Sequence, residues 1–191
     1  MSATQTDKEA TVRYTLDGVE QTVSADYVLV SVGRVPNTDK LGLESTGVKT
    51  SDNGQIIVDE QGRTNVPHIF AMGDIVPGLP LAHKASYEAK IAAEVIAGED
   101  VKIDYAVIPA VCFTDPELAT AGFTPKQATE KGYDAKVSTF PFLANGRALS
   151  LGKTEGFVRL VTDKETGSIL GAQIAGVGAS DLIGELVIAM E

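Results

Sequence analysis

The segment that most constrains the fold of this chain is residues 64–98, TNVPHIFAMGDIVPGLPLAHKASYEAKIAAEVIAG. It predicts a short apolar strand at 69–72, which ends in Gly73 and Asp74. A loop rich in Pro and Gly follows, and then a long helix from near Leu81 to a closing glycine, which fits a C-terminal cap. Open α/β sheets bind ligands at the carboxyl ends of their strands, and a helix start offers free N–H groups with partial positive charge. The segment therefore predicts a site for a ligand with hydroxyl groups and an electron-rich end.

The predicted helix carries small side chains at helical spacing. They are Ala82, Ala85, Ala89, Ala92, Ala93 and Ile96, which fall roughly on one face. Such a face lets a helix lie close to a sheet or to a flat ligand. Spacing alone favours neither of these two interpretations.

Composition excludes several classes of protein. The chain has 191 residues, of which 43% are hydrophobic and 22% charged, as in an ordinary globular protein of one domain or two small ones. Its net charge of −10 argues against nucleic-acid binding, which needs a basic surface. No apolar run approaches the ~20 residues of a membrane helix, and the polar start MSATQTDKEA is not a secretory signal. We expect no nucleic-acid partner and no membrane.

The single cysteine, Cys112, cannot form an internal disulfide or a cysteine-based zinc cluster. Neither HExxH nor GxSxG occurs, so we predict no metal site. Cys112 lies in a strand pattern, which predicts a core thiol and not a redox centre. This cysteine usage is consistent with the cytoplasm.

The N-terminal part predicts a β-hairpin at 11–23, because Asp17-Gly18 is a type I′ turn signal. The nearly continuous apolar run at 25–33 predicts a strand buried on both faces of a parallel sheet. The chain then breaks at 33–38, where Gly33 permits close backbone approach, as expected for a crossing between domains. Another strand is predicted at 55–58.

The composition changes at 98–104, where we place a domain boundary. Strands are predicted at 107–114, 118–123, 135–142, 156–162 and 168–175, the last two as an antiparallel hairpin. Thr124 with Gln127 predicts a capping box at a helix start. A final helix at 180–191 has an apolar face but no stop signal. Together with a parallel-type strand that has no partner strands, this open end suggests a piece of a longer protein.

Five segments then resemble one known family. They are VGRVPNT at 32–38, TNVPHIFAMGD at 64–74, LAHKASYEAKIAAEVIAG at 81–98, IPAVCFTDPELATAGFT at 108–124 and FPFLANGRAL at 140–149. In this order they resemble the C-terminal part of the dihydrolipoamide dehydrogenases, the flavin-disulfide oxidoreductases of 2-oxoacid dehydrogenase complexes. The first two segments specify only the wider pyridine nucleotide-disulfide oxidoreductase group. LAHKASYEA and ANGRAL point to dihydrolipoamide dehydrogenase, in the form found in Gram-positive bacteria.

The resemblance implies a fold that combines α/β and α+β parts. Residues 1–38 would be the tail of a Rossmann-like NAD-binding domain, and residues 39–103 the central FAD-binding segment. Residues 104–191 would be an α+β dimerisation domain with an antiparallel sheet, truncated at its C-terminus. The implied protein is a cytoplasmic homodimer that associates with the lipoyl-bearing E2 core of a 2-oxoacid dehydrogenase complex.

The resemblance also implies a flavin site with FAD as cofactor. Asp74 would bond a ribityl hydroxyl, because an ionised carboxylate accepts strongly from hydroxyl groups. Pro80, Leu81, Ala82 and His83 would lie beside the flavin ring, with the N–H groups of Ala82 and His83 at its N1 and C2 carbonyl edge. A helix N-terminus stabilises negative charge there by ~0.3–1 kcal/mol.

Other residues receive smaller roles from the resemblance. Gly33 would lie near the adenosine end of NAD, and Arg34 would pair with a cofactor phosphate or a carboxylate at the domain interface. His83 would act through its backbone, and His68 would lie at the surface. No catalytic residue is expected in this chain, because the redox-active CxxxxC, both GxGxxG loops and the His-Pro…Glu acid/base pair of the family do not occur in it.

The implied reaction is oxidation of protein-bound dihydrolipoamide by NAD⁺ through FAD. We expect the chain alone to be inactive and, as purified, colourless, because the loop that would bind the phosphate of the adenine half of FAD does not occur in it. Two alternatives are another reductase of the group, of the glutathione, mercuric or trypanothione type, and a non-catalytic module that binds FAD or mediates oligomerisation.

Overall fold

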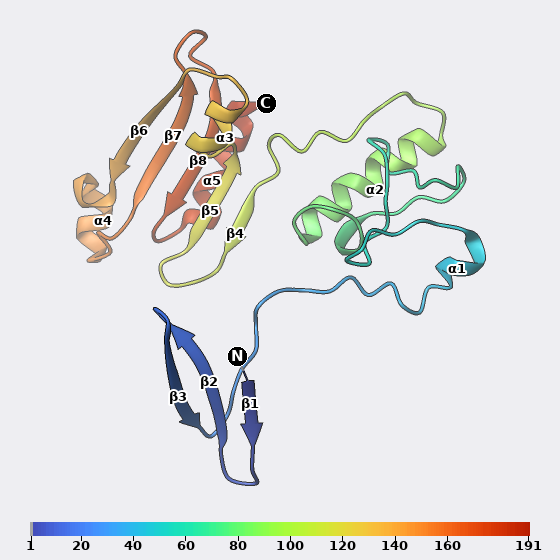
Figure 1. Cartoon of the computed structure of the whole chain (residues 1–191). Coiled ribbons are helices and arrows are strands. Elements are labelled where there is room, and N and C mark those ends of the chain that lie inside the picture. Colours follow the sequence, from blue (N-terminus) through green and yellow to red (C-terminus); the bar gives the residue numbers. More distant parts are fainter. Residues whose placement is uncertain (1) are drawn as a thin grey trace. The chain divides into compact units, whose positions relative to one another are not determined.

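The computed structural model describes residues 2–191, which form two compact units (Figure 1). The first unit extends to Val35, and the second is Pro36–Glu191. The predicted division into three domains at residues 38 and 103 stays a prediction.

The first unit is a three-stranded antiparallel sheet in the order β1-β2-β3. Its strands are β1 (Ser2–Gln5), β2 (Ala10–Leu16) and β3 (Val19–Ala25). Asp17 and Gly18 connect β2 and β3 with φ angles of 51° and 79°, and two successive positive φ values are the mark of a type I′ turn. The predicted hairpin is therefore confirmed.

The apolar run that follows β3 is not a strand. Tyr27, Leu29 and Val32 are more than nine-tenths exposed, and residues 27–32 pair with no strand of the described chain. The prediction of a buried parallel strand is thus wrong for this structure. The physical reason is that a parallel strand gains its hydrogen bonds and its burial from neighbouring strands, and residues 2–191 supply none here.

The first half of the second unit has little regular structure besides one long helix. Its elements are α1 (Leu43–Thr46), the 3₁₀ turn η1 (Gly73–Ile75) and α2 (Ala82–Ile96). The strands predicted at 55–58 and 69–72 are wrong, because each segment forms only an isolated bridge, through Ile56 and Phe70 respectively. Loop hydrogen bonds hold these segments instead. A small core of Val48, Ile56, Ala71 and Val76 lies beneath them.

The second half of this unit contains a five-stranded antiparallel sheet in the order β4-β5-β8-β7-β6. Its strands are β4 (Ala110–Cys112), β5 (Leu118–Gly122), β6 (Ala135–Pro141), β7 (Phe157–Asp163) and β8 (Ile169–Ala175). The helices are α3 (Pro125–Glu130), η2 (Phe142–Ala144), α4 (Gly146–Leu151) and α5 (Ala179–Met190). The predicted antiparallel sheet and the β7–β8 hairpin are confirmed.

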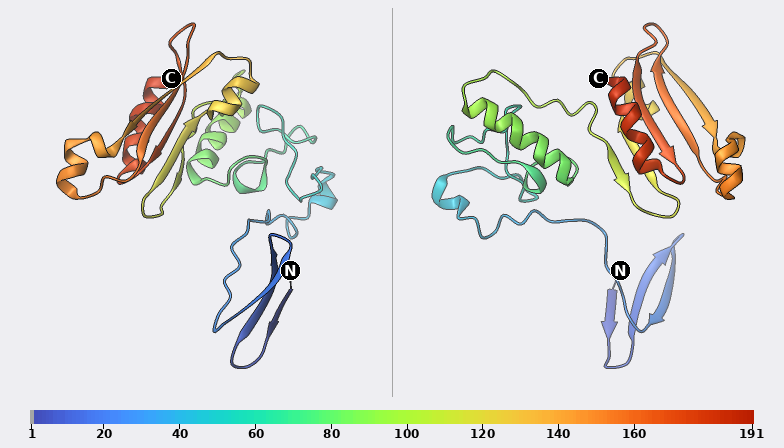
Figure 2. Two further views of the ribbon diagram at one scale, coloured as in Figure 1. Left: turned by 60° about the vertical axis from the view of Figure 1, so that its left-hand side comes forward. Right: turned by 180° about the vertical axis from the view of Figure 1, so that it is seen from behind.

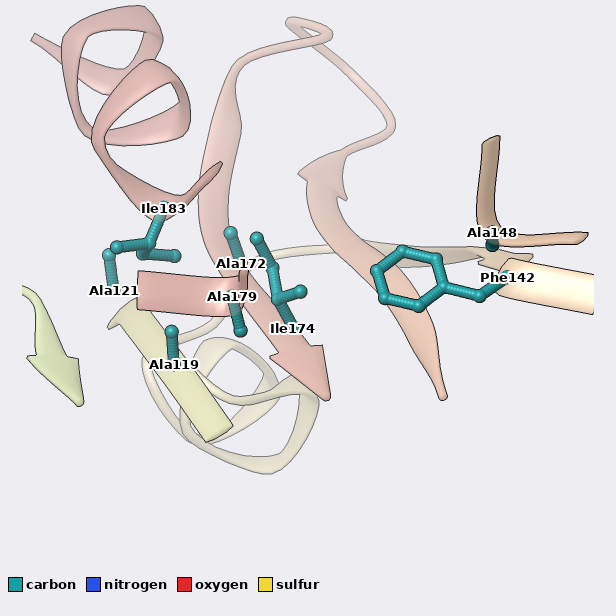
Figure 3. Packing of buried hydrophobic residues seen from close by; sticks show 8 residues of the cluster. All are labelled: Ala119, Ala121, Phe142, Ala148, Ala172, Ile174, Ala179 and Ile183. Atoms are coloured by element: carbon teal, nitrogen blue, oxygen red, sulfur yellow. The ribbon is translucent and has the colours of Figure 1, made fainter. Parts of the chain in front are cut away.

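Helix α5 covers one face of this sheet, as the further views show (Figure 2). Ala179 and Ile183 of α5 face Ala119, Ala121 and the neighbouring side chains of β8 (Figure 3). Small alanines at the contact let the helix lie close to the strands. The C-terminal half therefore has a core of its own.

Two further sequence predictions for this half have opposite outcomes. Thr124 accepts from the N–H of Gln127 and the Gln127 side chain accepts from the N–H of Thr124, so the capping box is confirmed. Cys112 is exposed, and its assignment to the core is wrong. The reason is its place on β4, which is the edge strand of the sheet.

Candidate functional site

The Gly73–Asp74 turn packs directly against α2. Gly73 is buried, has a φ of +80° and begins η1. A Cβ at this position would lie 3.2 Å from the Cβ of Ala85, which is tighter than an ordinary van der Waals contact. Glycine thus lets the chain turn and lets α2 approach it. Asp74, the next residue, is exposed.

The start of α2 has no side-chain cap. Leu81 is the N-cap residue, with extended φ and ψ of −125° and 133°, and its side chain accepts no hydrogen bond. Among the described residues, no acceptor is recorded for the amide N–H of Ala82, His83 or Lys84. Since Ala82 and His83 are exposed, the helix offers accessible N–H donors and the positive end of its dipole.

The imidazole of His83 is turned to the segment before β4. Its Nε2 lies 2.6 Å from the carbonyl oxygen of Pro109. Because a carbonyl only accepts, this contact assigns the ring proton to Nε2. This bond holds the imidazole toward Pro109, and the backbone N–H of His83 lies at the exposed helix start. His68 is exposed, as expected.

A buried ion pair connects α2 to the Gly73 turn, and the sequence analysis missed it. Lys84 and Glu88 are only 3% and 1% exposed. Lys84 Nζ lies 2.8 Å from Glu88 Oε1, and it donates to the carbonyl of Gly73 at 3.2 Å. Glu88 Oε2 accepts from the N–H of Gly73 at 2.7 Å. Both side chains thus bind the backbone of one residue.

A tyrosine completes the surroundings of this pair. The hydroxyl of Tyr105 donates to Glu88 Oε1 at 2.5 Å, and Lys84 Nζ lies 5.9 Å from the centre of the Tyr105 ring. Burial and the hydrogen bond to Glu88 raise the pKa of the Tyr105 phenol well above its usual value. Beside Tyr105 lies a cleft of about 250 Å³ lined by Gly78, Leu79, Leu81, Lys84, Tyr105 and Ile108.

The predicted small-residue face of α2 is wrong in part. Ala92 is buried, but Ala82, Ala89, Ala93 and Ile96 are exposed. The face that packs inward is Lys84, Glu88, Ile91, Ala92 and Val95. The buried face could have been found from Ile91 and Val95, since Lys84 and Glu88 precede them by whole helical turns.

The remaining predicted site residues lie as follows. Pro80 and Leu81 lead into α2 and are exposed and half-buried respectively. Gly33 lies in the first unit with a φ of +149°, a conformation that favours glycine.

Within residues 2–191, no three His, Cys, Asp or Glu side chains are grouped as a metal site. None of the described helices is long and apolar enough to cross a membrane.

Profiles of one family match most of the chain. Residues 1–89 match the pyridine nucleotide-disulphide oxidoreductase family. Residues 108–191 match the dimerisation domain of the same family. Residues 90–107, which lie between the two matches, comprise the second half of α2 and the segment that follows it.

Curated relatives and solved structures agree with this match. The chain is 59% identical over 190 residues to the dihydrolipoyl dehydrogenase of Staphylococcus aureus, covering 100% of this chain and 41% of that protein. It is 60% identical over 181 residues to the dihydrolipoyl dehydrogenase of Bacillus subtilis, covering 95% and 38%. The structure of LpdA from Mycobacterium tuberculosis superposes with a TM-score of 0.88 at 33% identity, covering 99% of this chain and 41% of that one. The flavoprotein disulfide reductase RclA from Escherichia coli has a TM-score of 0.83 at 26% identity, covering 98% and 43%. The chain thus spans about two fifths of the length of these relatives.

Proposed function

Because this chain belongs to the pyridine nucleotide-disulphide oxidoreductase family, we propose that it serves in a dihydrolipoyl dehydrogenase, an enzyme that oxidises protein-bound dihydrolipoamide with NAD⁺ through FAD. The observation that carries the proposal is the 59% identity to the S. aureus enzyme along the whole of this chain. In this role the chain supplies contacts to the flavin and a dimer interface.

The residues at the start of α2 fit a flavin. The uncapped, accessible N–H groups of Ala82 and His83 suit the N1 and C2 carbonyl edge of the ring, and the Asp74 carboxylate suits a ribityl hydroxyl. When bound, FAD supplies the electron transfer between a dithiol and NAD⁺. These protein groups orient the ring and stabilise negative charge at its pyrimidine edge by ~0.3–1 kcal/mol, or up to ~2 kcal/mol where the site is partly buried.

The C-terminal half supports a homodimer. Its match to a dimerisation domain agrees with large apolar side chains that this chain leaves uncovered, among them Phe113 at 80%, Leu143 at 64% and Ile188 at 78% exposure. Exposed apolar groups of this size mark interaction surfaces. Association with the lipoyl-bearing E2 core of a 2-oxoacid dehydrogenase complex, NAD contact at Gly33 and a cytoplasmic location stay predictions.

Two other functions compete with this one. A disulfide reductase of another type is favoured by the fold shared with RclA, but the identity is 26% there against 59% for the dihydrolipoyl dehydrogenase of S. aureus. A non-catalytic module is favoured by the single cysteine, because a redox disulfide needs two. We therefore expect the purified chain to show no turnover with NAD⁺ and dihydrolipoamide, even with added FAD.

A chimera tests the proposal. This chain replaces the matching 190 residues of the S. aureus dihydrolipoyl dehydrogenase, and the product is assayed for NAD⁺ reduction by dihydrolipoamide. We expect a yellow protein with clear activity, and an Asp74→Asn version with less bound FAD. A chimera that folds and binds FAD but does not oxidise dihydrolipoamide would contradict the proposal, as would turnover by the chain alone.

A further inference from the structure

The backbone of Gly73 is held at both of its polar groups by one pair of side chains. Glu88 accepts its N–H at 2.7 Å, and Lys84 donates to its carbonyl at 3.2 Å. The two side chains are themselves joined at 2.8 Å. This arrangement links the turn that precedes Asp74 to the first two turns of α2.

The burial of this pair is costly and needs an explanation. A buried ion pair must lose its hydration, and a well-packed apolar pair is often as stable or more stable. Here the carboxylate of Glu88 is balanced by three donors, namely Gly73 N–H, Lys84 Nζ and the Tyr105 hydroxyl. Such complete pairing fixes one geometry, because each group loses a partner if the turn moves.

The same helix contains a matched pair that lacks this role. Lys90 and Glu94 have the same residue types at the same spacing, but they lie 3.9 Å apart with side chains 73% and 38% exposed. Among residues 2–191, neither of these two side chains bonds to a segment outside the helix. Helix α2 therefore carries one pair at its surface and one that binds a distant turn.

We propose that Lys84 and Glu88 are positioning residues, whose ion pair fixes the Gly73–Asp74 turn against the start of α2. The proposal rests on the proposed function, since the two groups so aligned are the Asp74 carboxylate and the N–H donors of Ala82 and His83. Neither Lys84 nor Glu88 touches the ligand in this account. They set the spacing between the Asp74 carboxylate, which would accept from a hydroxyl group, and the two amide N–H donors.

The steric fit at Gly73 acts in the same direction. The close approach to Ala85 limits movement of the turn toward α2, and the ion pair limits movement away from it. Tyr105 extends the network, because its hydroxyl brings the segment that follows α2 to the same carboxylate. The turn, the helix and the following segment are thus joined at Glu88.

The first test needs no flavin. Amide hydrogen exchange is measured by NMR on the full chain and on Glu88→Ala, with Lys90→Met/Glu94→Gln as the control. We expect exchange at Gly73 and Asp74 to become at least about tenfold faster in Glu88→Ala, with little change in the last turns of α2. The control should match wild type. If the amides of Gly73 and Asp74 exchange in Glu88→Ala at the same rates as in wild type, the proposal is overturned.

The second test measures the dissociation constant for added FAD by fluorescence in the same proteins. We expect a rise of about tenfold or more in Glu88→Ala, as is typical when a group that orients a ligand contact is lost, and no change in the control. If wild type binds FAD and Glu88→Ala binds it with equal affinity, the positioning role is overturned. Wild type that does not bind FAD overturns the proposed function, and with it the flavin role of the pair, whatever the exchange rates show.

Milder variants keep the tests decisive if Glu88→Ala does not fold. Lys84→Met/Glu88→Gln removes both charges and keeps the shapes, and Tyr105→Phe removes only one donor from the half-exposed Tyr105. Both should accelerate exchange at Gly73, Tyr105→Phe the less, and both should weaken FAD binding without a matching loss in thermal stability. A purely structural role would lower stability and FAD affinity in proportion.

Discussion

Adding one methyl group at Gly171 should destabilise the C-terminal half of the chain severely. Gly171 is buried in β8, and a Cβ there would lie 2.0 Å from the carbonyl oxygen of Phe123 and 2.7 Å from its nitrogen. Real contacts of this kind are longer by about 1 Å or more, so the backbone at Phe123 must move. Because Phe123 follows β5 and its N–H bonds to Leu170 of β8, its displacement disturbs the pairing of the two strands.

The magnitude follows from two terms. Overpacking of a core costs ~1–3 kcal/mol. Movement of Phe123 also breaks its N–H bond to Leu170 at 2.8 Å and the bond from the Gln173 side chain to its carbonyl at 3.2 Å, at about 1 kcal/mol each. Gly171→Ala should therefore lower the free energy of unfolding by about 3–5 kcal/mol. For a domain of this size, that is a fall in Tm of more than about 10 °C.

Gly184→Ala is the matched control. Gly184 lies inside α5, is exposed, and a Cβ there would meet no atom within 4 Å. Alanine is the better helix former by about 0.5–1 kcal/mol, so this variant should melt at a higher temperature than wild type. Thermal unfolding by circular dichroism compares the two. An unchanged Tm for Gly171→Ala, or equal losses in both variants, would refute the packing argument.

Three further predictions concern single side chains. The pKa of Glu117 is held below its usual range because the carboxylate accepts the N–H of Ser180 at the start of α5. The stabilisation from this bond is present above the ordinary pKa of a glutamate and is lost as the pH falls. Glu117→Gln should therefore flatten the acid side of a plot of Tm against pH. The pKa of Tyr105 is raised by burial and by the hydrogen bond to Glu88. The stabilisation of the fold from this phenol is present below the ordinary tyrosine pKa and is lost as the pH rises above it. In an absorbance titration, Tyr105→Phe should remove the phenol that ionises latest. Asn145 caps α4 with its side chain, and Asn145→Ala should cost about 1 kcal/mol in chemical denaturation, a value near zero being the contrary result.

Local signals were sufficient for much of the fold. Asp17-Gly18 determines a type I′ turn by its own backbone preferences, and Thr124 with Gln127 satisfies the first N–H groups of α3 within one turn. The β7–β8 hairpin follows from alternation and a short connection. These features depend on residues that are close in sequence, so the sequence predicts them well.

Features that depend on distant partners were predicted poorly. The run at 27–32 has the composition of a buried strand, but no neighbouring strand covers it among the described residues. Cys112 has the pattern of a core residue, and only the sheet order shows that β4 is an edge. Whether a strand pattern is buried is thus decided by topology, which periodicity does not contain.

The site shows the same limit most clearly. Lys84 with Glu88 and Lys90 with Glu94 are the same motif on the same helix, yet the first pair is buried and the second exposed. Such pairs are typical of solvated helix faces, so the pair motif by itself does not separate them, and only the helical spacing of Lys84 and Glu88 from Ile91 and Val95 does. The Gly73 turn, eleven or more residues earlier in the chain, makes the difference.

Binding of flavin at the Gly73–Asp74 turn and the start of α2 is the central claim, and an NMR titration of the ¹⁵N-labelled chain with FAD tests it most directly. We predict that the amide signals of Asp74, Ala82 and His83 shift together and reach saturation at one FAD concentration, and that Asp74→Asn requires more FAD for the same effect. Shifts confined to other regions, or none at saturating FAD, would contradict the claim.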